Sequence, residues 1–324
     1  MPKLREAGLV LGLVLGFVAG CGADGAESGA LRIGDQKGNS RTLLAAAGLL
    51  ADFPHRVEWS TFTSGPPLLE AASAGAIDVG AVGNTPPIFA AAADAKIAVV
   101  QAAKGSVEGD AVLVPGDSPL RRVEDLAGRG IAVAKGSSAH GQLLTTLTGA
   151  GLTTRDVELN FLQPSDAYAA FQQKRVDAWA VWDPYTSQAL LETGARVLAD
   201  GRGSGGSASG YTFYVAGRSA LGDNGKTPAM REFLSRVAKA QRWADTHREE
   251  WAKAWAAETG LKVDVARAAT ARGPDLPVPL DAEVVDAEQR LADAFTADGT
   301  LPGRVDFAKF VDTRFQDARF EGEQ

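Results

Sequence analysis

Polar residues recur at four places where a strand-like run gives way to a helical one. These segments are residues 36–40, 63–67, 83–87 and 135–140. Each offers Ser, Thr or Asn for a helix N-cap, and two place proline in the first turn, where its missing N–H is not needed. Helix N-termini present unpaired N–H groups and the positive end of the helix dipole. Capping alone explains any single segment, but four at one sheet edge predict a cleft for a tetrahedral or planar oxyanion.

A second chemical feature is Cys21, the only cysteine of the chain. It follows the small residues Ala19 and Gly20, after a basic start and an apolar run at residues 7–17. That order is typical of a secretory signal, and the run is shorter than the roughly 20 apolar residues that span a bilayer. A thiol at the cleavage point indicates a bacterial lipobox, in which the cysteine is diacylated.

The lipobox predicts how the N-terminal region is divided. Residues 1–20 are expected to be a signal peptide, and residues 21–30 a lipid-anchored tether that is flexible because it is rich in glycine and polar residues. Two acyl chains give lasting attachment where one is marginal. The remaining chain is then expected at the extracytoplasmic face of the bacterial cell membrane. The alternative is a plain secretory peptide with a chance cysteine.

Two other patterns suggest enzymatic chemistry but are better explained otherwise. His140 lies near Ser137 and Ser138, as a base near a nucleophile would, yet the chain lacks a Gly-x-Ser-x-Gly nucleophile elbow there. Residues 201–206 match a dinucleotide fingerprint, but a strand-like run follows them instead of a helix, so the match is taken as accidental. The three histidines lack metal-ligand spacing. We expect no catalytic residue, metal or cofactor.

The elements that must position the polar segments alternate between strand-like and helical runs. This alternation predicts an α/β fold with parallel layers. Strands are expected at residues 31–34, 56–59, 77–80, 97–100, 111–114, 131–133, 157–161, 178–181 and 211–215. Long amphipathic helices are expected at 230–258 and 282–295, with their aromatic residues, including Trp251 and Trp255, in the core. Trp179 is also expected in the core.

Composition narrows the classes of partner. The 324 residues include 33 basic and 40 acidic side chains, giving a formal net charge of −7, so nucleic acid is an unfavourable partner. A single cysteine leaves no internal disulfide, and stability must come from packing in one large core or two medium ones.

Five motifs together resemble a known family. They occupy residues 33–38, 64–71, 83–90, 135–140 and 178–185. In this order and spacing they are similar to the aliphatic sulfonate-binding proteins of ABC importers, in the nitrate/taurine/sulfonate branch of the type 2 periplasmic-binding fold. The resemblance extends from residue 31 almost to the C-terminus.

The resemblance implies two α/β lobes that close over one sulfonate. Lobe I would comprise residues 31–114 plus 216–324, including the C-terminal helices, and lobe II residues 115–215. Two hinge strands would fall near 113–115 and 214–216. Closure would couple to binding because both lobes contribute to the site.

The resemblance also implies which residues contact the ligand. The head group would be held by polar residues of both lobes, and Trp182 would cover the aliphatic tail with Asp183 and Tyr211 beside it. The head-group residues would be Gln36, Asn39, Ser40, Gly65, Asn84, Thr85, Ser137, Ser138 and His140. A helix start with a capping Asp183 explains the segment after Trp182 equally well.

Asn84 departs from the family pattern. Many members carry aspartate at this position, after a Thr-Gly or Val-Gly pair. An amide can donate a hydrogen bond to a sulfonate oxygen and a carboxylate cannot, so Asn84 favours simple alkanesulfonates over an amine-bearing ligand such as taurine. A plain N-cap is the alternative role.

The function implied is that of a monomeric transport receptor, which binds an alkanesulfonate and delivers it to an ABC permease with its ATPase for sulfur acquisition. Related ligands (taurine, a sulfate ester, nitrate) and a thiamine-pyrimidine-type protein on the same fold remain alternatives. An enzyme of the pyrimidine-synthesis branch would need a cysteine-rich site, which this chain lacks. A sensor lipoprotein is a third possibility.

Overall fold

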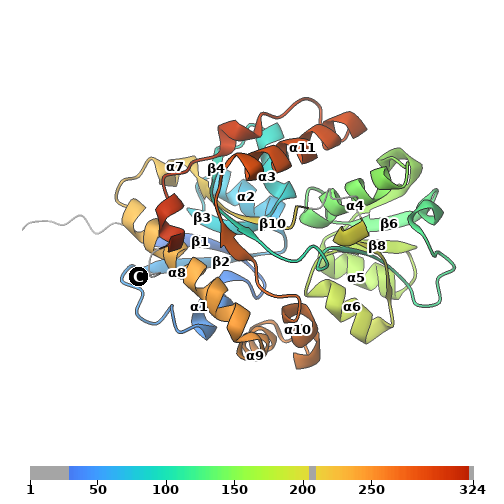
Figure 1. Cartoon of the computed structure of the whole chain (residues 1–324), viewed down its shortest axis with the longest axis horizontal. Helices are drawn as coiled ribbons and strands as arrows, with labels where there is room; N and C mark the ends of the chain where they lie inside the picture. The colour runs from blue at the N-terminus through green and yellow to red at the C-terminus, as the bar shows by residue number, and fades with distance from the viewer. Residues whose placement is uncertain (1–28, 204–208, 321–324) are drawn as a thin grey trace, which may run out of the picture.

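Two mixed β-sheets organise the molecule, and Figure 1 shows them side by side with helices packed around each. The computed structural model describes residues 29–203 and 209–320. The predicted signal peptide, Cys21 and residues 22–28 of the predicted tether lie outside these ranges. Within them, every helix is too short or too polar to cross a membrane.

The first sheet contains six strands: β1 (Leu31–Gln36), β2 (Val57–Phe62), β3 (Val79–Gly83), β4 (Ile97–Lys104), β10 (Tyr211–Gly217) and β11 (Leu276–Val278). Their order is β11-β4-β10-β3-β1-β2. β1 pairs in parallel with β2 and β3, whereas β10 is antiparallel to β3 and β4, and β11 is antiparallel to β4.

The second sheet contains five strands: β5 (Ala111–Val114), β6 (Gly130–Val133), β7 (Glu158–Phe161), β8 (Ala178–Val181) and β9 (Arg196–Asp200). Their order is β7-β6-β8-β5-β9. β6 is parallel to β7 and β8, and β5 is antiparallel to β8 and β9. Each sheet thus has the expected parallel pairs, around β1 and β6, together with antiparallel strands that were not predicted.

Helices pack on each sheet. The first half of the molecule carries α1 (Ser40–Ala46), α2 (Gly65–Ser73), α3 (Thr85–Ala92), α7 (Arg218–Leu221), α8 (Thr227–Thr246), α9 (Arg248–Thr259) and α11 (Ala282–Asp298). The second half carries α4 (Ser138–Gly149), α5 (Pro164–Gln172) and α6 (Tyr185–Thr193). α10 (Val263–Thr270) packs against both α9 and α6. Short 3-10 helices are η1 (Val123–Leu126), η2 (Thr154–Asp156), η3 (Gly201–Gly203), η4 (Phe307–Phe310) and η5 (Gln316–Phe320).

The chain passes between the sheets after β4, at residues 105–110, and after β9, where residues 201–203 and 209–210 are described. Each passage leads into a strand that runs against its neighbours, β5 or β10. The predicted hinges near 113–115 and 214–216 instead fall at the end of β5 and inside β10. The predicted boundaries therefore assign β5 to lobe I and most of β10 to lobe II, whereas β5 belongs to the second sheet and β10 to the first.

All nine predicted strands are present, as β1–β8 and β10, whereas β9, β11 and α10 were not predicted. The helix predicted over 230–258 is two helices, because His247 leaves helical geometry with φ −124° and ψ 44°. The next element after residues 201–206, apart from the short η3 at 201–203, is the strand β10 and not a helix. The match to a dinucleotide fingerprint is therefore accidental, as expected.

Apolar clusters cover both faces of each sheet. Alternate residues of β10 supply the two clusters of the first sheet, Phe213 and Val215 on one face and Tyr214 and Ala216 on the other. Trp179 of β8 is 1% exposed and belongs to a cluster of the second sheet, as predicted. Both sheets are therefore firmly packed platforms for the loops at their ends.

Candidate functional site

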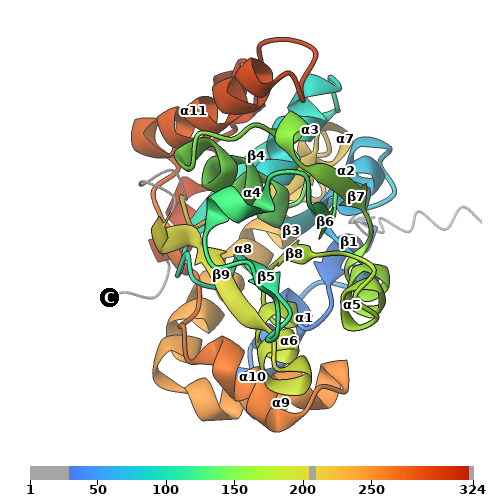
Figure 2. The same ribbon diagram turned by 90° about the vertical axis from the view of Figure 1, so that its right-hand side faces the viewer.

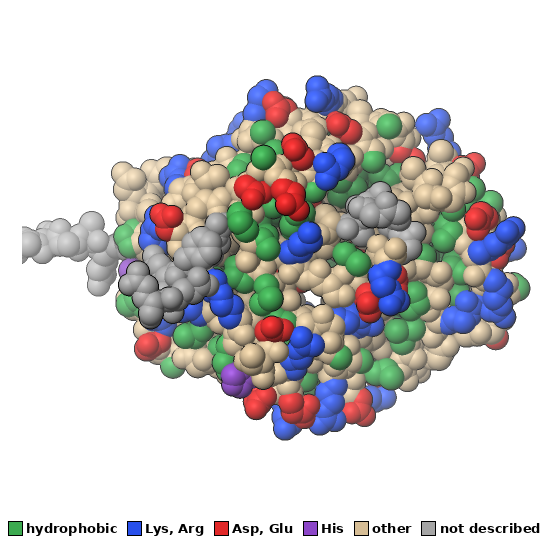
Figure 3. All heavy atoms as spheres, in the orientation of Figure 1, with side chains coloured by type: hydrophobic (Ala, Val, Ile, Leu, Met, Phe, Trp, Pro, Cys, Tyr) green, Lys and Arg blue, Asp and Glu red, His purple; other side chains and the backbone are tan. Residues whose placement is uncertain are grey.

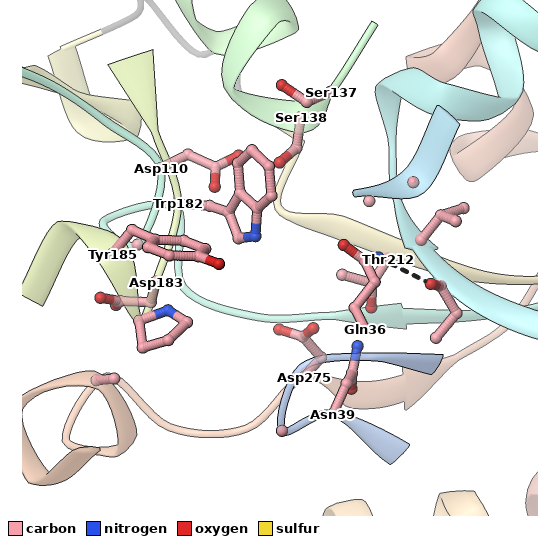
Figure 4. Close-up of a pocket in the computed structure, with 18 of the residues that line it drawn as sticks. Gln36, Asn39, Asp110, Ser137, Ser138, Trp182, Asp183, Tyr185, Thr212 and Asp275 are labelled. Carbon is pink, nitrogen blue, oxygen red and sulfur yellow. Dashed lines mark hydrogen bonds between the residues drawn. The ribbon is translucent and has the colours of Figure 1, made fainter. Parts of the chain in front are cut away.

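A cavity of about 720 Å³ lies between the two halves. Figure 3 shows a hollow near the centre of one face, with charged side chains of both signs around it. The cavity is lined by the loops before α1, α2, α3, α4 and α6, by both passages between the sheets, and by parts of α9 and α10. Figure 4 shows side chains from these segments pointing toward a common space.

The starts of α2, α3 and α4 converge at this cavity. A β-carbon on Gly65, at the start of α2, would lie 2.5 Å from Pro86 of α3. A β-carbon on Gly83, just before α3, would lie 2.8 Å from Ser138 of α4. Only glycine therefore allows the three helix starts to approach this closely. In the described part of the chain, the amide N–H groups of Gly65 and Ser138 have no hydrogen-bond partner. These amides are available to an anion.

The start of α1 differs, because a protein carboxylate already occupies it. Asp35 accepts hydrogen bonds from the amides of Ser40 and Arg41, at 3.0 Å each. Burial raises the pKa of Asp35 to about 6, and those backbone hydrogen bonds oppose the rise. The starts of α2 and α4 are therefore open to a ligand, whereas the start of α1 is not.

Nine of the twelve predicted ligand residues line the cavity: Gln36, Asn39, Gly65, Asn84, Ser137, Ser138, Trp182, Asp183 and Tyr211. Ser137 caps α4 by accepting from the amide of His140 at 3.3 Å, which leaves its own O–H free to donate. Gln36 donates one amide N–H to the carbonyl of Ala81 at 3.0 Å.

The other three, Ser40, Thr85 and His140, lie behind the cavity wall and do not line it. Ser40 is 1% exposed and bonds through its hydroxyl to Tyr214 at 2.8 Å. Thr85 is fully buried and donates to Asn84 at 3.0 Å. Each hydroxyl thus has a protein partner and lies behind the wall, so direct ligand contact by these side chains stays a prediction.

His140 fills a different place from the one predicted. It is fully buried, with ring centroids 5.6 Å from Phe89, 5.3 Å from Phe295 and 5.6 Å from Phe161. Its Nδ1 accepts from the amide of Gly136 at 3.1 Å, and its Nε2 has no partner among the described residues. Burial and the charge of Lys135 lower the pKa of His140 to about 4, and Asp298 opposes this.

Asn84 is not a side-chain cap. It occupies the N-cap position of α3, but its side chain makes no capping bond and donates instead to Ser209 at 2.9 Å. The same serine lies 3.4 Å from Glu288, a fully buried carboxyl whose pKa is raised by burial. The capping alternative is wrong for this side chain.

Asp183 both caps α6 and forms an ion pair. It accepts from the amide and the hydroxyl of Ser187 at 3.0 and 2.7 Å, as the helix-start interpretation predicts. It also lies 2.5 Å from a guanidinium nitrogen of Arg272, beyond the end of α10. Burial raises the pKa of Asp183, against the charge of Arg272. Both side chains line the cavity.

Two further carboxyls of the cavity wall were not predicted. Asp110, just before β5, accepts from the hydroxyl of Ser138, and Asp275, just before β11, accepts from Thr212. Burial raises the pKa of Asp110 to about 7; the Ser138 bond opposes this, and the charges of Asp183 and Asp275 add to it. Burial likewise raises the pKa of Asp275. No motif surrounds either residue, so only the fold could identify them.

Trp251 and Trp255 pack against apolar clusters, as expected, and they line the cavity as well. They stack with ring centroids 5.5 Å apart and planes 7° apart. The sequence did contain a signal for this stacked pair: a spacing of four residues puts both rings on one face of α9. With Trp182 and Tyr185, they give the cavity a largely aromatic side.

The two halves meet on two sides of the cavity. In the aromatic contact, His140 of α4 and Phe161 of β7 meet Phe89 of α3 and Phe295 of α11. In the ionic contact, Arg272 and Lys262, which flank α10, pair with Asp183 before α6 and Glu192 within α6, at 2.5 and 3.3 Å. Figure 2 shows α11 at one end of the molecule and α9 and α10 at the other.

The arrangement can bind an anion by hydrogen bonding and cover an apolar or aromatic tail. Residues 29–203 and 209–320 contain no group of three or more His, Cys, Asp or Glu side chains placed to hold a metal ion. Neither Ser137 nor Ser138 has a histidine base, since the ring of His140 bonds to a backbone amide behind the wall.

Comparison with known proteins agrees with this geometry. The profile of the NMT1-like family matches residues 41–259. A protein of Escherichia coli (strain K12), named as aliphatic sulfonates-binding, is 39% identical over 299 residues, which cover 91% of each chain. The structure of the alkanesulfonate-binding protein SsuA from Xanthomonas axonopodis pv. citri bound to MOPS has 38% identity and a TM-score of 0.81, covering 88% of this chain and 98% of that one.

The periplasmic aliphatic sulphonate binding protein SsuA from Escherichia coli has 37% identity and a TM-score of 0.75, covering 88% of this chain and 92% of that one. All three relatives are named as binding proteins and not as enzymes. The predicted two-lobe periplasmic-binding fold is confirmed by these structures. Because the family profile covers more than half of the chain and the similarity covers most of it, the chain belongs to the NMT1-like family and is a relative of the aliphatic sulfonate-binding proteins.

Proposed function

We propose that this protein is the substrate-binding lipoprotein of an ABC importer and captures aliphatic sulfonates outside the cytoplasmic membrane. The observation that carries the proposal is the set of unpaired amides and the free Ser137 hydroxyl at converging helix starts. A sulfonate has three oxygens that accept such hydrogen bonds, and charged partners strengthen them. The names of the relatives, one of them periplasmic, support the same ligand class and compartment.

Binding is coupled to closure of two lobes in this proposal. The proposed lobes are residues 31–114 plus 216–324 and residues 115–215. The boundary strands differ from these bounds, because β5 belongs to the second sheet and most of β10 lies within residues 115–215 but belongs to the first. Head-group residues come from both halves, Gly65 from one and Ser137 and Ser138 from the other. A ligand that bonds to both stabilises the closed form, and that form docks on the permease as a monomer.

A thermal-shift screen of the mature domain tests the ligand class. The panel contains short and long alkanesulfonates, taurine, aromatic sulfonates, sulfate esters, sulfate, nitrate and a thiamine-precursor pyrimidine, all in sulfonate-free buffer. A Tm that rises with alkanesulfonate concentration is expected, because a ligand that binds only the folded state stabilises it. The proposal would be overturned if no sulfonate changed the Tm while nitrate or the pyrimidine raised it.

The lipid anchor is tested separately. Mass spectrometry of protein extracted from membranes is expected to show a diacylated N-terminal Cys21, and Cys21→Ala is expected to release the protein from the membrane fraction. An unmodified, soluble mature form in the wild type would remove the anchor and leave the binding proposal intact.

A further inference from the structure

Glu288 is a fully buried carboxyl that the binding site described so far does not explain. It lies on the buried face of α11, where its neighbours one turn away are Val284, Leu291 and Ala292. In the described part of the chain, its Oε2 has no hydrogen-bond partner, and its Oε1 accepts from the hydroxyl of Ser209 at 3.4 Å. Burying a carboxyl this way costs free energy that an apolar side chain would avoid, which indicates a role beyond packing.

Ser209 connects this buried carboxyl to the cavity. Its Oγ accepts from the side-chain amide of Asn84 at 2.9 Å and from the backbone amide of Tyr211 at 3.4 Å. Because two N–H groups already point at this oxygen, its own proton must be donated elsewhere, and Glu288 accepts it. Ser209, Asn84 and Tyr211 line the cavity, whereas Glu288 lies behind its wall.

The bond from Ser209 to Glu288 decides which way the amide of Asn84 is turned. While Ser209 donates its single proton to Glu288, it can only accept from Asn84, so the NH₂ end of the amide faces Ser209. The Oδ1 end then accepts from the hydroxyl of Thr85 at 3.0 Å. One Nδ2 hydrogen remains after these bonds. A sulfonate oxygen only accepts hydrogen bonds, so it can use this hydrogen but could not use an amide oxygen.

We propose that Glu288 is a positioning residue for the head-group site: through Ser209, it holds the amide of Asn84 so that an N–H is available to the sulfonate. This inference rests on the proposed function, because it takes a sulfonate at the helix starts as given. The role requires an acceptor and not a charge. Burial raises the pKa of Glu288 well above its ordinary value, and the carbonyl oxygen of the neutral acid accepts the same bond.

The competing role for Glu288 is purely structural, as a tie between α11 and the segment around Ser209. The two roles predict different results for Glu288→Leu. Loss of a structural tie would lower the Tm and leave the intrinsic affinity for sulfonate unchanged. Loss of a positioning residue would weaken sulfonate binding with an unchanged or higher Tm, because leucine replaces a buried carboxyl by an apolar side chain.

The test is calorimetric titration of the mature protein with pentanesulfonate, together with thermal unfolding without ligand. Glu288→Leu is expected to bind about tenfold more weakly than wild type, because an N–H is turned away from a charged acceptor. Glu288→Gln keeps an oxygen acceptor for Ser209 and should bind within about threefold of wild type. Asp286→Leu, at an exposed carboxyl of α11 outside the cavity, is the matched control and should leave the affinity unchanged.

Variants of Asn84 and Ser209 show whether the effect passes along this chain of hydrogen bonds. Asn84→Ala should weaken binding about tenfold, and adding Glu288→Leu to it should weaken binding no further, because residues that act through one another are not additive. Ser209→Ala should reproduce the loss seen in Glu288→Leu, and it keeps the test decisive if Glu288→Leu does not fold.

Three results would overturn the inference. They are wild-type affinity in Glu288→Leu, an equal loss on adding Glu288→Leu with and without Asn84, and wild-type affinity in Ser209→Ala. Failure of the proposed function looks different, because wild type itself would then bind none of the alkanesulfonates.

Discussion

The aromatic contact and the ionic contact join the same two halves by different physics. The aromatic contact buries a neutral imidazole among three phenyl rings, so its weak point is protonation. The ionic contact pairs charges on partly exposed side chains, so its weak point is the loss of a partner or screening by salt. We therefore expect acid to weaken the aromatic contact and salt to weaken the ionic contact, on opposite sides of the same cavity.

Acid is expected to have the largest effect, through His140. Its pKa of about 4 in the folded protein lies below the ordinary value of 6.5, so the unfolded chain binds more protons between these values. The free energy of unfolding should fall as pH drops from 6.5 to 4, by at most about 3 kcal/mol, and level off below. The measurement is urea unfolding of wild type and His140→Gln across this range.

The comparison with the variant is essential, because other groups act in the opposite direction. The pKa of Asp35 is raised to about 6 and that of Asp110 to about 7, so both add stability as pH falls through these values. They are common to wild type and His140→Gln and cancel in the difference. A difference that does not change with pH would contradict the account of the aromatic contact.

Arg272→Ala should give the next largest effect, on the ionic contact. It leaves Asp183 without its cation; the two side chains are 20% and 14% exposed, so water screens part of the cost. We expect the free energy of unfolding to fall by about 2 kcal/mol at pH 8. Urea unfolding of Arg272→Ala with and without Asp183→Asn checks this, and equal stability of the two would argue against an unpaired charge as the cause.

Ser137→Ala tests whether Ser137, which is hydrogen-bonded to the amide of His140 in the aromatic contact, also binds the ligand. Ser137 caps α4 through the amide of His140 and has a free O–H at the cavity. Loss of that donor to a sulfonate should weaken binding by about 1.5 kcal/mol. Calorimetry of Ser137→Ala beside Ser40→Ala, which lies behind the wall, measures it. Equal losses in both would refute the placement of the head group.

The smallest effect is expected at Lys262, the exposed part of the ionic contact. Its ammonium lies 3.3 Å from Glu192, but the lysine side chain is 75% exposed. Lys262→Ala should cost about 0.5 kcal/mol of stability or less, and the cost should vanish in about 1 M salt because exposed pairs are screened. A larger loss of stability that does not change with salt would show that the Lys262–Glu192 pair is not a screened, exposed ion pair.

Local sequence signals predicted much of the fold and one side of the site. Periodicity located the nine strands, and helix-start chemistry located α2, α3 and α4, because both depend on neighbours in the chain. The antiparallel direction of β5 and β10 could not be predicted, since strand direction depends on connections across the molecule. Asp110, Arg272 and Asp275 have no motif, and they reach the cavity only because distant passages meet.

The close fit of Gly38 to Trp255 has a consequence for how such a receptor can change over time. Gly38 has a φ of 76°, and any β-carbon on it would lie 1.8 Å from the indole nitrogen of Trp255. The loop before α1 and the aromatic wall therefore cannot vary independently. A lineage that adds a side chain at position 38 must first accept a smaller residue at position 255, so new tail specificity and a rebuilt first loop should be acquired together.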